Sequence, residues 1–230
     1  MGSLARSPVG TELLDDPAAD ADAVAESLGH IARANRWFGG TVAVLRGLRI
    51  ALADIPRGAA LTLLDLGTGI GDLPLAAARR AEESGIDIRP LGLEVSAVAA
   101  GLARDRGVAV ALADIGALPF APRSVDIVLL SQVLHHFASD SIVEILRAAD
   151  RVARRTVIVA DLRRSRAALA SFAVGSRLMR FDPLTRADGR TSIRRGFSTL
   201  ELESLLRRAG VAAAVRRSPG WRLVAVWRPT

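Results

Sequence analysis

The chain has 230 residues, 50% of them hydrophobic, and a formal net charge of +7 at pH 7. This length suits one domain with a large core, and no apolar run approaches the ~20 residues that a membrane span needs. There is no cysteine, which excludes disulfides and thiolate chemistry. The start of the chain lacks the basic-then-apolar layout of a secretory signal, so we expect a cytoplasmic protein.

The positive charge comes from arginine and is uneven along the chain. All 31 basic residues are arginine; residues 1–150 carry a net charge of −6, and residues 151–230 carry +13. A basic C-terminal third is suited to RNA, an anionic membrane surface or an acidic substrate. It also fits a solvated, arginine-rich surface in a chain of biased composition, which is the interpretation we favour.

The start of the chain predicts a lead-in followed by helices. Residues 1–22 are rich in Asp, Ala and Pro and are typical of a poorly ordered segment. Apolar residues recur at helical spacing over residues 23–55. Gly39-Gly40 interrupts this pattern and leaves Arg36 and Trp37 beside the break, as weaker candidates for contact with a ligand.

A glycine-rich turn between a strand and a helix is the strongest local signal. Residues 61–66 form an apolar run typical of a strand buried on both faces of a parallel sheet, and residues 75–81 favour a helix. Between them stands Gly67-Thr68-Gly69-Ile70-Gly71. Glycines let the backbone approach a ligand closely, and the helix N-terminus offers free N–H groups. The dinucleotide fingerprint would require its third glycine at Asp72.

Acidic residues end the next two predicted strands. Residues 86–94 read as a second strand that ends in Glu94, 23 residues past the last glycine of the turn. A carboxylate at this position can accept hydrogen bonds from both ribose hydroxyls. Residues 108–113 read as a third strand, and Asp114 follows it directly.

The fourth strand, over residues 124–130, leads into Ser131-Gln132-Val133-Leu134-His135-His136. Histidine has an unperturbed pKa near 6.5, which suits proton removal at neutral pH. The chain has three histidines and no cysteine or tyrosine, so His135 and His136 are candidate bases. The alternative interpretation is that this pair packs the loop.

The last part of the chain alternates between variable and well-marked segments. Residues 156–160 read as a fifth strand, and residues 162–197 as a weakly helical stretch followed by a polar loop over 182–195. The apolar residues of this stretch either line a pocket or belong to the core. Residues 198–210 carry capping-box and stop signals of a helix, and residues 211–227 predict a closing hairpin.

Four motifs stand at set places relative to these strands: Asp65 with Gly67-Thr68-Gly69-Ile70-Gly71, Glu94-Val95, Asp114-Ile115, and Leu134-His135-His136. Together they resemble the class I S-adenosylmethionine (SAM)-dependent methyltransferases, closely over residues 61–161 and in outline over 197–230. The resemblance implies an α/β, Rossmann-like, seven-stranded and mostly parallel sheet. Helices would cover both faces, and the last strand would be antiparallel.

The resemblance makes SAM the cofactor and gives each motif a part of it. The amino-acid end would be held by Asp65, Gly67, Thr68, Gly69 and Gly71, the ribose by Glu94 followed by Val95, and the adenine by Asp114 and Ile115. The reacting centre would be bordered by Ser131, Gln132, His135 and His136. No metal site is expected.

The resemblance also implies a domain organisation and an activity. Residues 1–55 would form an N-terminal helical cap, and residues 56–230 a SAM-binding domain with a substrate-covering insertion near 162–197. The expected reaction is O-methylation of a small phenolic, quinone or polyketide-like compound of secondary metabolism. The oligomeric state stays open.

Three alternatives stand beside this expectation. One is C-methylation of a similar acceptor. Another is an RNA methyltransferase that uses the basic C-terminal third, which lacks the interleaved aromatic residues that base stacking needs. The last is a SAM-binding protein without turnover, which would carry the same binding residues. A dehydrogenase is disfavoured because the third glycine of its fingerprint is missing.

Overall fold

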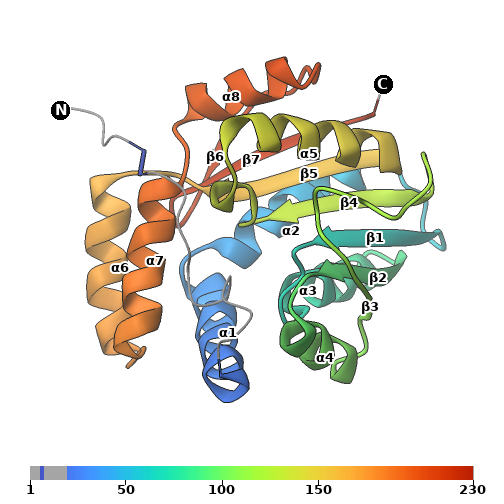
Figure 1. Cartoon of the computed structure of the whole chain (residues 1–230). Helices are drawn as coiled ribbons and strands as arrows, with labels where there is room; N and C mark the ends of the chain where they lie inside the picture. Colours follow the sequence, from blue (N-terminus) through green and yellow to red (C-terminus); the bar gives the residue numbers. More distant parts are fainter. Residues whose placement is uncertain (1–5, 8–19, 230) are drawn as a thin grey trace.

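A seven-stranded sheet organises the structure, with strand order β3-β2-β1-β4-β5-β7-β6 (Figure 1). The computed structural model describes residues 6–7 and 20–229. The strands are β1 (Ala60–Leu66), β2 (Asp87–Glu94), β3 (Ala109–Leu112), β4 (Val125–Ser131), β5 (Ala153–Leu162), β6 (Arg216–Ser218) and β7 (Arg222–Trp227). Strands β1 to β5 are parallel, and β7 runs antiparallel to β5. The expected fold is therefore confirmed.

Eight α-helices and a short 3-10 helix are present in the described part of the chain. They are α1 (Ala21–Trp37), α2 (Gly40–Ala51), α3 (Asp72–Glu82), α4 (Ala97–Asp105), η2 (Leu134–His136), α5 (Ser139–Val152), α6 (Arg166–Leu178), α7 (Pro183–Arg195) and α8 (Thr199–Arg208). None of these helices is long and apolar enough to cross a membrane. The lead-in expected over residues 1–22 lies mostly outside the described residues.

The central strands are buried on both faces, as their continuous apolar runs predicted. Successive side chains of a strand point to opposite faces. In β1, Leu63 belongs to the core cluster that includes residues of α2 and α3, whereas Leu64 belongs to the cluster with α5 and α8. Ile127 and Val128 of β4 divide in the same way. The sheet is thus held rigidly between two helical layers, and its carboxyl edge is a fixed platform.

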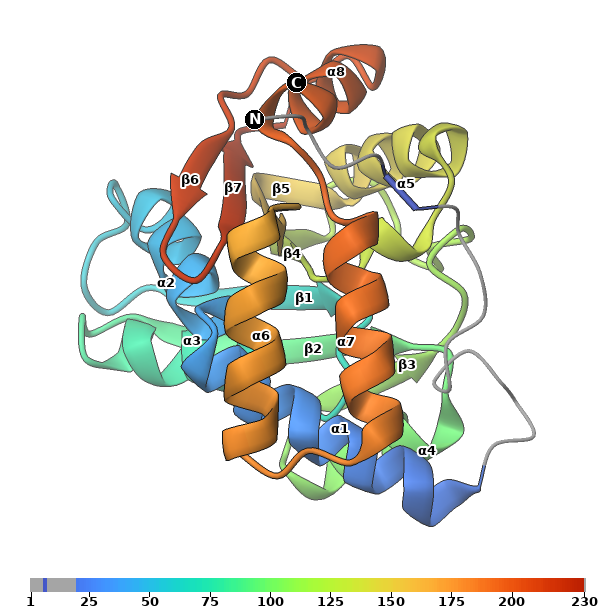
Figure 2. The same ribbon diagram turned by 90° about the vertical axis from the view of Figure 1, so that its left-hand side faces the viewer.

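Three helices lie beyond the carboxyl ends of the strands. In Figure 1 the arrowheads of β1 and β4 point toward α1, α6 and α7, and Figure 2 shows these helices in front of that edge. The Nδ1 atom of His30, in α1, lies 3.0 Å from Oδ2 of Asp182, at the start of α7. We call α1, α6 and α7 the lid helices.

The prediction of a polar loop over residues 182–195 is wrong, because this segment forms the helix α7. Asp182 is its N-cap and accepts the N–H groups of Leu184 (2.8 Å) and Thr185 (2.9 Å). Pro183 follows at a first-turn position, where its missing N–H costs no hydrogen bond. Asp182-Pro183 was the available sequence signal for the start of a helix. The helix was not predicted because the segment lacks a broad apolar stripe.

The basic C-terminal third pairs with acids from the first 150 residues. Arg154 donates to Asp126 at 2.9 Å, and Arg208 and Arg228 pair with Asp140 and Asp54. The opposite charges of the two parts of the chain therefore meet in the fold. The Arg208–Asp140 and Arg228–Asp54 pairs are exposed. Exposed pairs contribute about 0–1 kcal/mol each, so their main consequence is a less positive surface.

Gly47 allows α2 to pack directly on the sheet, and we expect Gly47→Ala to destabilise the protein. A Cβ atom at this position would lie 2.4 Å from Cγ2 of Ile158, which is fully buried. Overpacking of this kind costs about 1–3 kcal/mol. Urea unfolding should show that loss in the free energy of unfolding.

The matched control is Gly101→Ala in α4, where an added Cβ atom would meet nothing within 4 Å. Alanine is a better helix former than glycine by about 1 kcal/mol, so this variant should keep or gain stability. If the two variants had equal stability, the close packing of α2 on β5 would be contradicted.

Candidate active site

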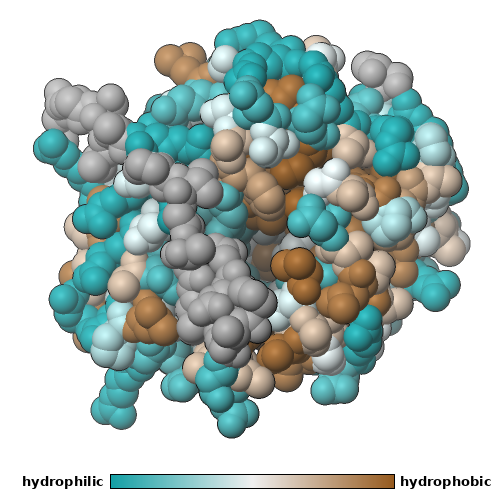
Figure 3. Space-filling view, viewed as in Figure 1, coloured by the Kyte–Doolittle hydropathy of each residue, from teal (hydrophilic) through white to brown (hydrophobic). Residues whose placement is uncertain are grey.

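Two cavities adjoin at the carboxyl edge of the sheet. The first, of about 1130 Å³, surrounds the glycine turn and the ends of β2 and β4, and we call it the glycine-turn cavity. The second, of about 880 Å³, lies against the lid helices, and we call it the lid cavity. Both are lined by Ile31, Asn35, Gln132 and His136. Figure 3, viewed as in Figure 1, shows apolar residues gathered in a hollow near the centre of that view.

The glycine turn has a backbone that only glycine adopts readily. Gly67, Gly69 and Gly71 have φ values of 77°, 54° and 74°, in the left-handed region. A Cβ atom at Gly67 would come within 2.9 Å of Val133, and one at Gly71 within 2.7 Å of Val108. The turn is therefore a close-packed cradle, in which Gly67 and Gly69 line the glycine-turn cavity and Gly71 does not.

Glu94 ties the tip of β2 to the glycine turn. Its Oε2 atom accepts the N–H of Gly69 at 2.9 Å, and its Oε1 atom accepts the N–H groups of Val95 (2.9 Å) and Ser96 (3.1 Å). Glu94 and Val95 both line the glycine-turn cavity. Val95 is 68% exposed, so a ligand in the cavity can cover an apolar side chain that the fold leaves open.

Asp114 and Ile115 line the same cavity from the loop after β3. Oδ1 of Asp114 accepts the N–H of Gly116 at 2.6 Å, which fixes the carboxylate in a tight turn. Ile115 is buried and packs into the main core cluster. The structure thus brings the predicted residues of three separate loops to one cavity.

Acidic groups gather behind the glycine turn. Asp65 is fully buried in β1 and does not line the cavity itself. Burial, and then the charges of Asp72 and Glu94, raise the pKa of Asp65 well above its usual value. Burial also raises the pKa of Asp72, which lines the cavity. A cationic ligand in the cavity would favour the ionised form of these carboxyl groups and would be attracted to them.

A chain of hydrogen bonds joins the two cavities. Arg222 donates to Oε1 of Gln132 at 3.1 Å, Gln132 donates to Asn35, and Asn35 donates to Asp72 at 3.0 Å. Gln132 has a φ of 54°, which is uncommon for a residue other than glycine. Such backbone conformations persist where surrounding contacts hold them. Ser131, the last residue of β4, also lines the glycine-turn cavity.

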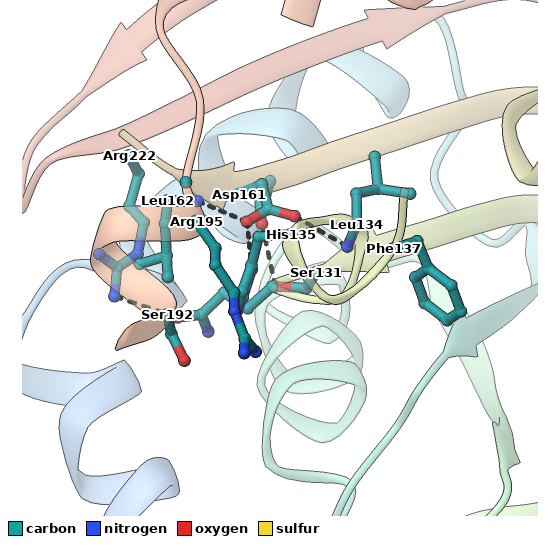
Figure 4. A network of polar contacts seen from close by, with 12 residues as sticks. Ser131, Leu134, His135, Phe137, Asp161, Leu162, Ser192, Arg195 and Arg222 are labelled. Carbon is teal, nitrogen blue, oxygen red and sulfur yellow. Dashed lines mark hydrogen bonds and ion pairs between the residues drawn. The ribbon is translucent and has the colours of Figure 1, made fainter. Parts of the chain in front are cut away.

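His135 and Asp161 form a buried pair at the floor of the lid cavity (Figure 4). His135 Nδ1 lies 2.7 Å from Oδ1 of Asp161. Burial opposes ionisation of Asp161, but the charge and hydrogen bond of His135 and the N–H of Leu162 outweigh it and lower the pKa of Asp161. With an ionised Asp161, Nδ1 of His135 is the donor, and Nε2 is left with a lone pair that can accept a proton.

His136 is a much weaker base than an ordinary histidine. Burial, and then repulsion by His135 when that ring is protonated, lower the pKa of His136 to about 3. Protonation of this ring is therefore unfavourable at neutral pH. His135, which pairs with the Asp161 carboxylate at 2.7 Å, is therefore the stronger candidate base.

Sequence reasoning missed several residues that line these cavities, namely Asn35, Asp72 and Arg222, as well as Asp161 behind His135. For Asp161, its place at the end of a buried strand beside β4 was an available signal. Arg36 and Trp37, the weaker candidates, are exposed and line neither cavity. Their neighbours Asn35 and Phe38 point inward instead, because α1 presents a different face to the sheet.

Residues 64–160 match a family model described as a methyltransferase domain. No curated protein sequence matches the chain.

Solved structures share the fold at low sequence identity. A SAM-dependent methyltransferase from Aquifex aeolicus superposes with a TM-score of 0.56 at 15% identity, covering 80% of this chain and 89% of that one. Magnesium protoporphyrin IX methyltransferase from Synechocystis, with bound S-adenosylhomocysteine, gives 0.56 at 15% identity and 84% coverage of each chain. A possible histamine N-methyltransferase from Thermotoga maritima gives 0.53 at 21% identity, with 89% and 99% covered.

The fold, the glycine cradle and the family match define a methyltransferase domain. The domain match covers residues 64–160, and solved SAM-dependent methyltransferases share the fold of the chain. The residues present suit SAM, which is a cation, because the carboxyl groups of Asp72 and Glu94 line the glycine-turn cavity together with Gly67 and Gly69.

The depressed pKa of His136 predicts a loss of stability in mild acid. An unfolded histidine binds a proton below pH 6.5, whereas His136 in the fold does so only near pH 3. The unfolded chain therefore binds more protons in that window, and stability falls as the pH falls. Between pH 7 and pH 5 we expect His136 to account for about 2 kcal/mol of lost stability.

Urea unfolding of the wild type and of His136→Asn at both pH values measures this contribution. The wild type should lose about 2 kcal/mol more than the variant on going from pH 7 to pH 5. Equal losses in the two proteins would show that His136 is accessible to protons in the folded state.

Proposed function

We propose that the protein transfers the methyl group of SAM to a hydroxyl oxygen of a small phenolic, quinone or polyketide-like compound in the lid cavity. The observation that carries this proposal is the His135–Asp161 pair, 2.7 Å apart, on the floor of that cavity. The cavity is otherwise mainly apolar, and its aromatic lining residues are Phe38, Phe172, Phe181 and Trp221. Such a lining suits a flat, aromatic acceptor.

The glycine-turn cavity is the proposed cofactor site. Its acidic wall and the backbone of Gly67, Gly69 and Gly71 would hold the amino-acid end of SAM, with Asp65 and Thr68 behind them. Glu94 and Val95 would hold the ribose, and Asp114 with Ile115 the adenine. Ser131 and Gln132 would border the methyl group. The convergence of all of these loops on one cavity supports the proposal.

SAM, when bound, supplies a methyl group already activated by its sulfonium. The chain then has to align the acceptor and remove its proton. Nε2 of His135 would take the hydroxyl proton, and Asp161 would stabilise the resulting imidazolium through Nδ1. His136, with a pKa of about 3, would shape the wall between the cavities.

The lid helices are the proposed cover of both ligands. α1 lines both cavities through Ile31 and Asn35, and α6 and α7 line the lid cavity. They fall in the expected N-terminal cap (1–55) and in the insertion near 162–197 of the proposed SAM-binding domain (56–230). Excluding water from the reacting centre is the function that this placement supports.

A C-methyltransferase is the second candidate, because the same base could remove a proton from an enolisable carbon. Solved structures of this fold include the carbon methyltransferase CurJ, at a TM-score of 0.56 and 11% identity, so the fold does not select the acceptor atom. RNA is disfavoured as the acceptor, since the ring-lined cavity is partly enclosed by helices and several arginines are already paired.

The base assignment predicts a large kinetic effect of His135→Ala. With radiolabelled SAM and an accepted phenol, the rate of methyl transfer should fall ~100-fold or more. SAM binding, measured by calorimetry, should stay intact. Asp161→Asn should slow transfer in the same direction, because it removes the acceptor that fixes the His135 tautomer.

His136→Ala is the matched control for this experiment. It should leave SAM binding intact and slow transfer much less than His135→Ala does. Equal rates in the two histidine variants would contradict the assignment of His135 as the base.

The ribose assignment predicts that Glu94→Ala weakens SAM binding by roughly 1–3 kcal/mol, the range for a lost charged hydrogen-bonding group. Calorimetric titration with SAM measures the change, and exposed Glu82 in α3 provides the control Glu82→Ala. Unchanged affinity in Glu94→Ala would contradict the assignment.

A further inference from the structure

Arg222 is a buried cation in the lining of the lid cavity. It is 6% exposed and stands at the start of β7. Its Nη1 donates to the backbone oxygen of Gly220 at 3.0 Å, and its Nη2 donates to Oε1 of Gln132 at 3.1 Å. Its Nε is buried and has no hydrogen-bond partner among the described residues. Both partners of Arg222 are neutral.

The fold does not neutralise this charge by contact. Arg222 forms no ion pair within the described ranges 6–7 and 20–229. Burial lowers the pKa of Arg222 to about 10, and the charge of Asp161 only partly opposes this. Asp161 already accepts hydrogen bonds from His135 and from the N–H groups of Leu134 and Leu162.

Arg164 shows what this protein does with a buried arginine that has a structural role. Its side chain is also 6% exposed, yet its Nη2 lies 2.6 Å from Oε1 of Glu201. Buried charges in proteins are normally paired in this way, because an unpaired buried charge is costly. Arg222 therefore stands out as a guanidinium whose counterion is missing from the chain.

The position of Arg222 joins it to the reacting centre. Its partner Gln132 lines both cavities. The Asp161 carboxylate, whose charge partly offsets the effect of burial on the pKa of Arg222, also pairs with the proposed base His135. Asp188, the acidic residue among those that line the cavity, comes from the lid helix α7 and not from the sheet. An anionic group of a ligand at Arg222 would thus lie at the sheet end of the lid cavity.

We propose that Arg222 binds a carboxylate of the acceptor, so that the substrate class is an aromatic hydroxy acid and not a neutral phenol. This inference rests on the proposed function for the identity of the reacting hydroxyl. A guanidinium presents parallel N–H donors that match the two oxygens of a carboxylate. The apolar rings of the cavity would contact the aromatic body, while Arg222 would set its orientation toward His135.

The test compares two probes that differ only in the carboxylate, 3-hydroxy-2-naphthoate and 2-naphthol. Each is titrated by calorimetry into protein saturated with S-adenosylhomocysteine. The wild type should bind the naphthoate about 10- to 100-fold more tightly, the effect of one charge-assisted pair. Arg222→Gln should lose this preference and keep its affinity for 2-naphthol.

Two further variants separate recognition from a structural role. Arg217→Gln changes an exposed arginine of the same hairpin and should keep the preference. Arg222→Lys keeps the charge without the fork and should retain a reduced preference; it also serves if Arg222→Gln does not fold. A structural role alone would instead weaken both probes equally and lower the melting temperature in both Arg222 variants.

Equal affinity of the wild type for the two probes, or no binding of either, would overturn the proposal. So would an unchanged preference in a folded Arg222→Gln. These readouts are independent of turnover. Methyl transfer to neutral phenols without a carboxylate preference would contradict this inference but not the proposed function. A carboxylate preference without methyl transfer to any hydroxyl group would contradict the proposed function but not the binding of a carboxylate by Arg222.

Discussion

The site depends on one buried carboxylate, that of Asp161 at the end of β5. It accepts N–H groups from both of the segments that leave the central strands, Leu134 after β4 and Leu162 on β5, and it pairs with His135. A buried carboxylate is costly unless it is fully hydrogen-bonded. Those bonds fix the course of the loop after β4, so the same interaction that offsets the burial of Asp161 places the histidine.

The sequence pattern predicted the residues of the glycine-turn cavity better than those of the lid cavity. Gly67, Glu94 and Asp114 follow strands whose carboxyl ends must meet at one edge of a parallel sheet, so local signals suffice to bring them together. Asn35 and Arg222 reach the same place from α1 and β7, through packing between segments far apart in the chain. No short-range sequence pattern encodes that packing, so neither residue was among the predicted site residues.

Helix α7 illustrates the other limit of sequence reasoning. Its residues are mostly polar, and its buried contacts are few, with Thr185, Ile193 and Arg195 facing inward. Its stability comes from the Asp182 cap and from its neighbours α6 and α1, and not from a wide apolar stripe. Hydrophobic periodicity therefore predicted a loop for this segment. The difference between loop and helix matters here, because α7 forms part of the wall of the lid cavity.

Asn35 and Ile31 give α1 one surface in common with both cavities. A ligand that holds α1 against the sheet in one cavity also preserves a wall of the other. The binding free energies of cofactor and acceptor are then linked through the position of a single helix, and this linkage is reciprocal. Release of either ligand would then remove contacts that hold α1 in place for the other, so the order in which the two products leave would affect the rate at which each leaves.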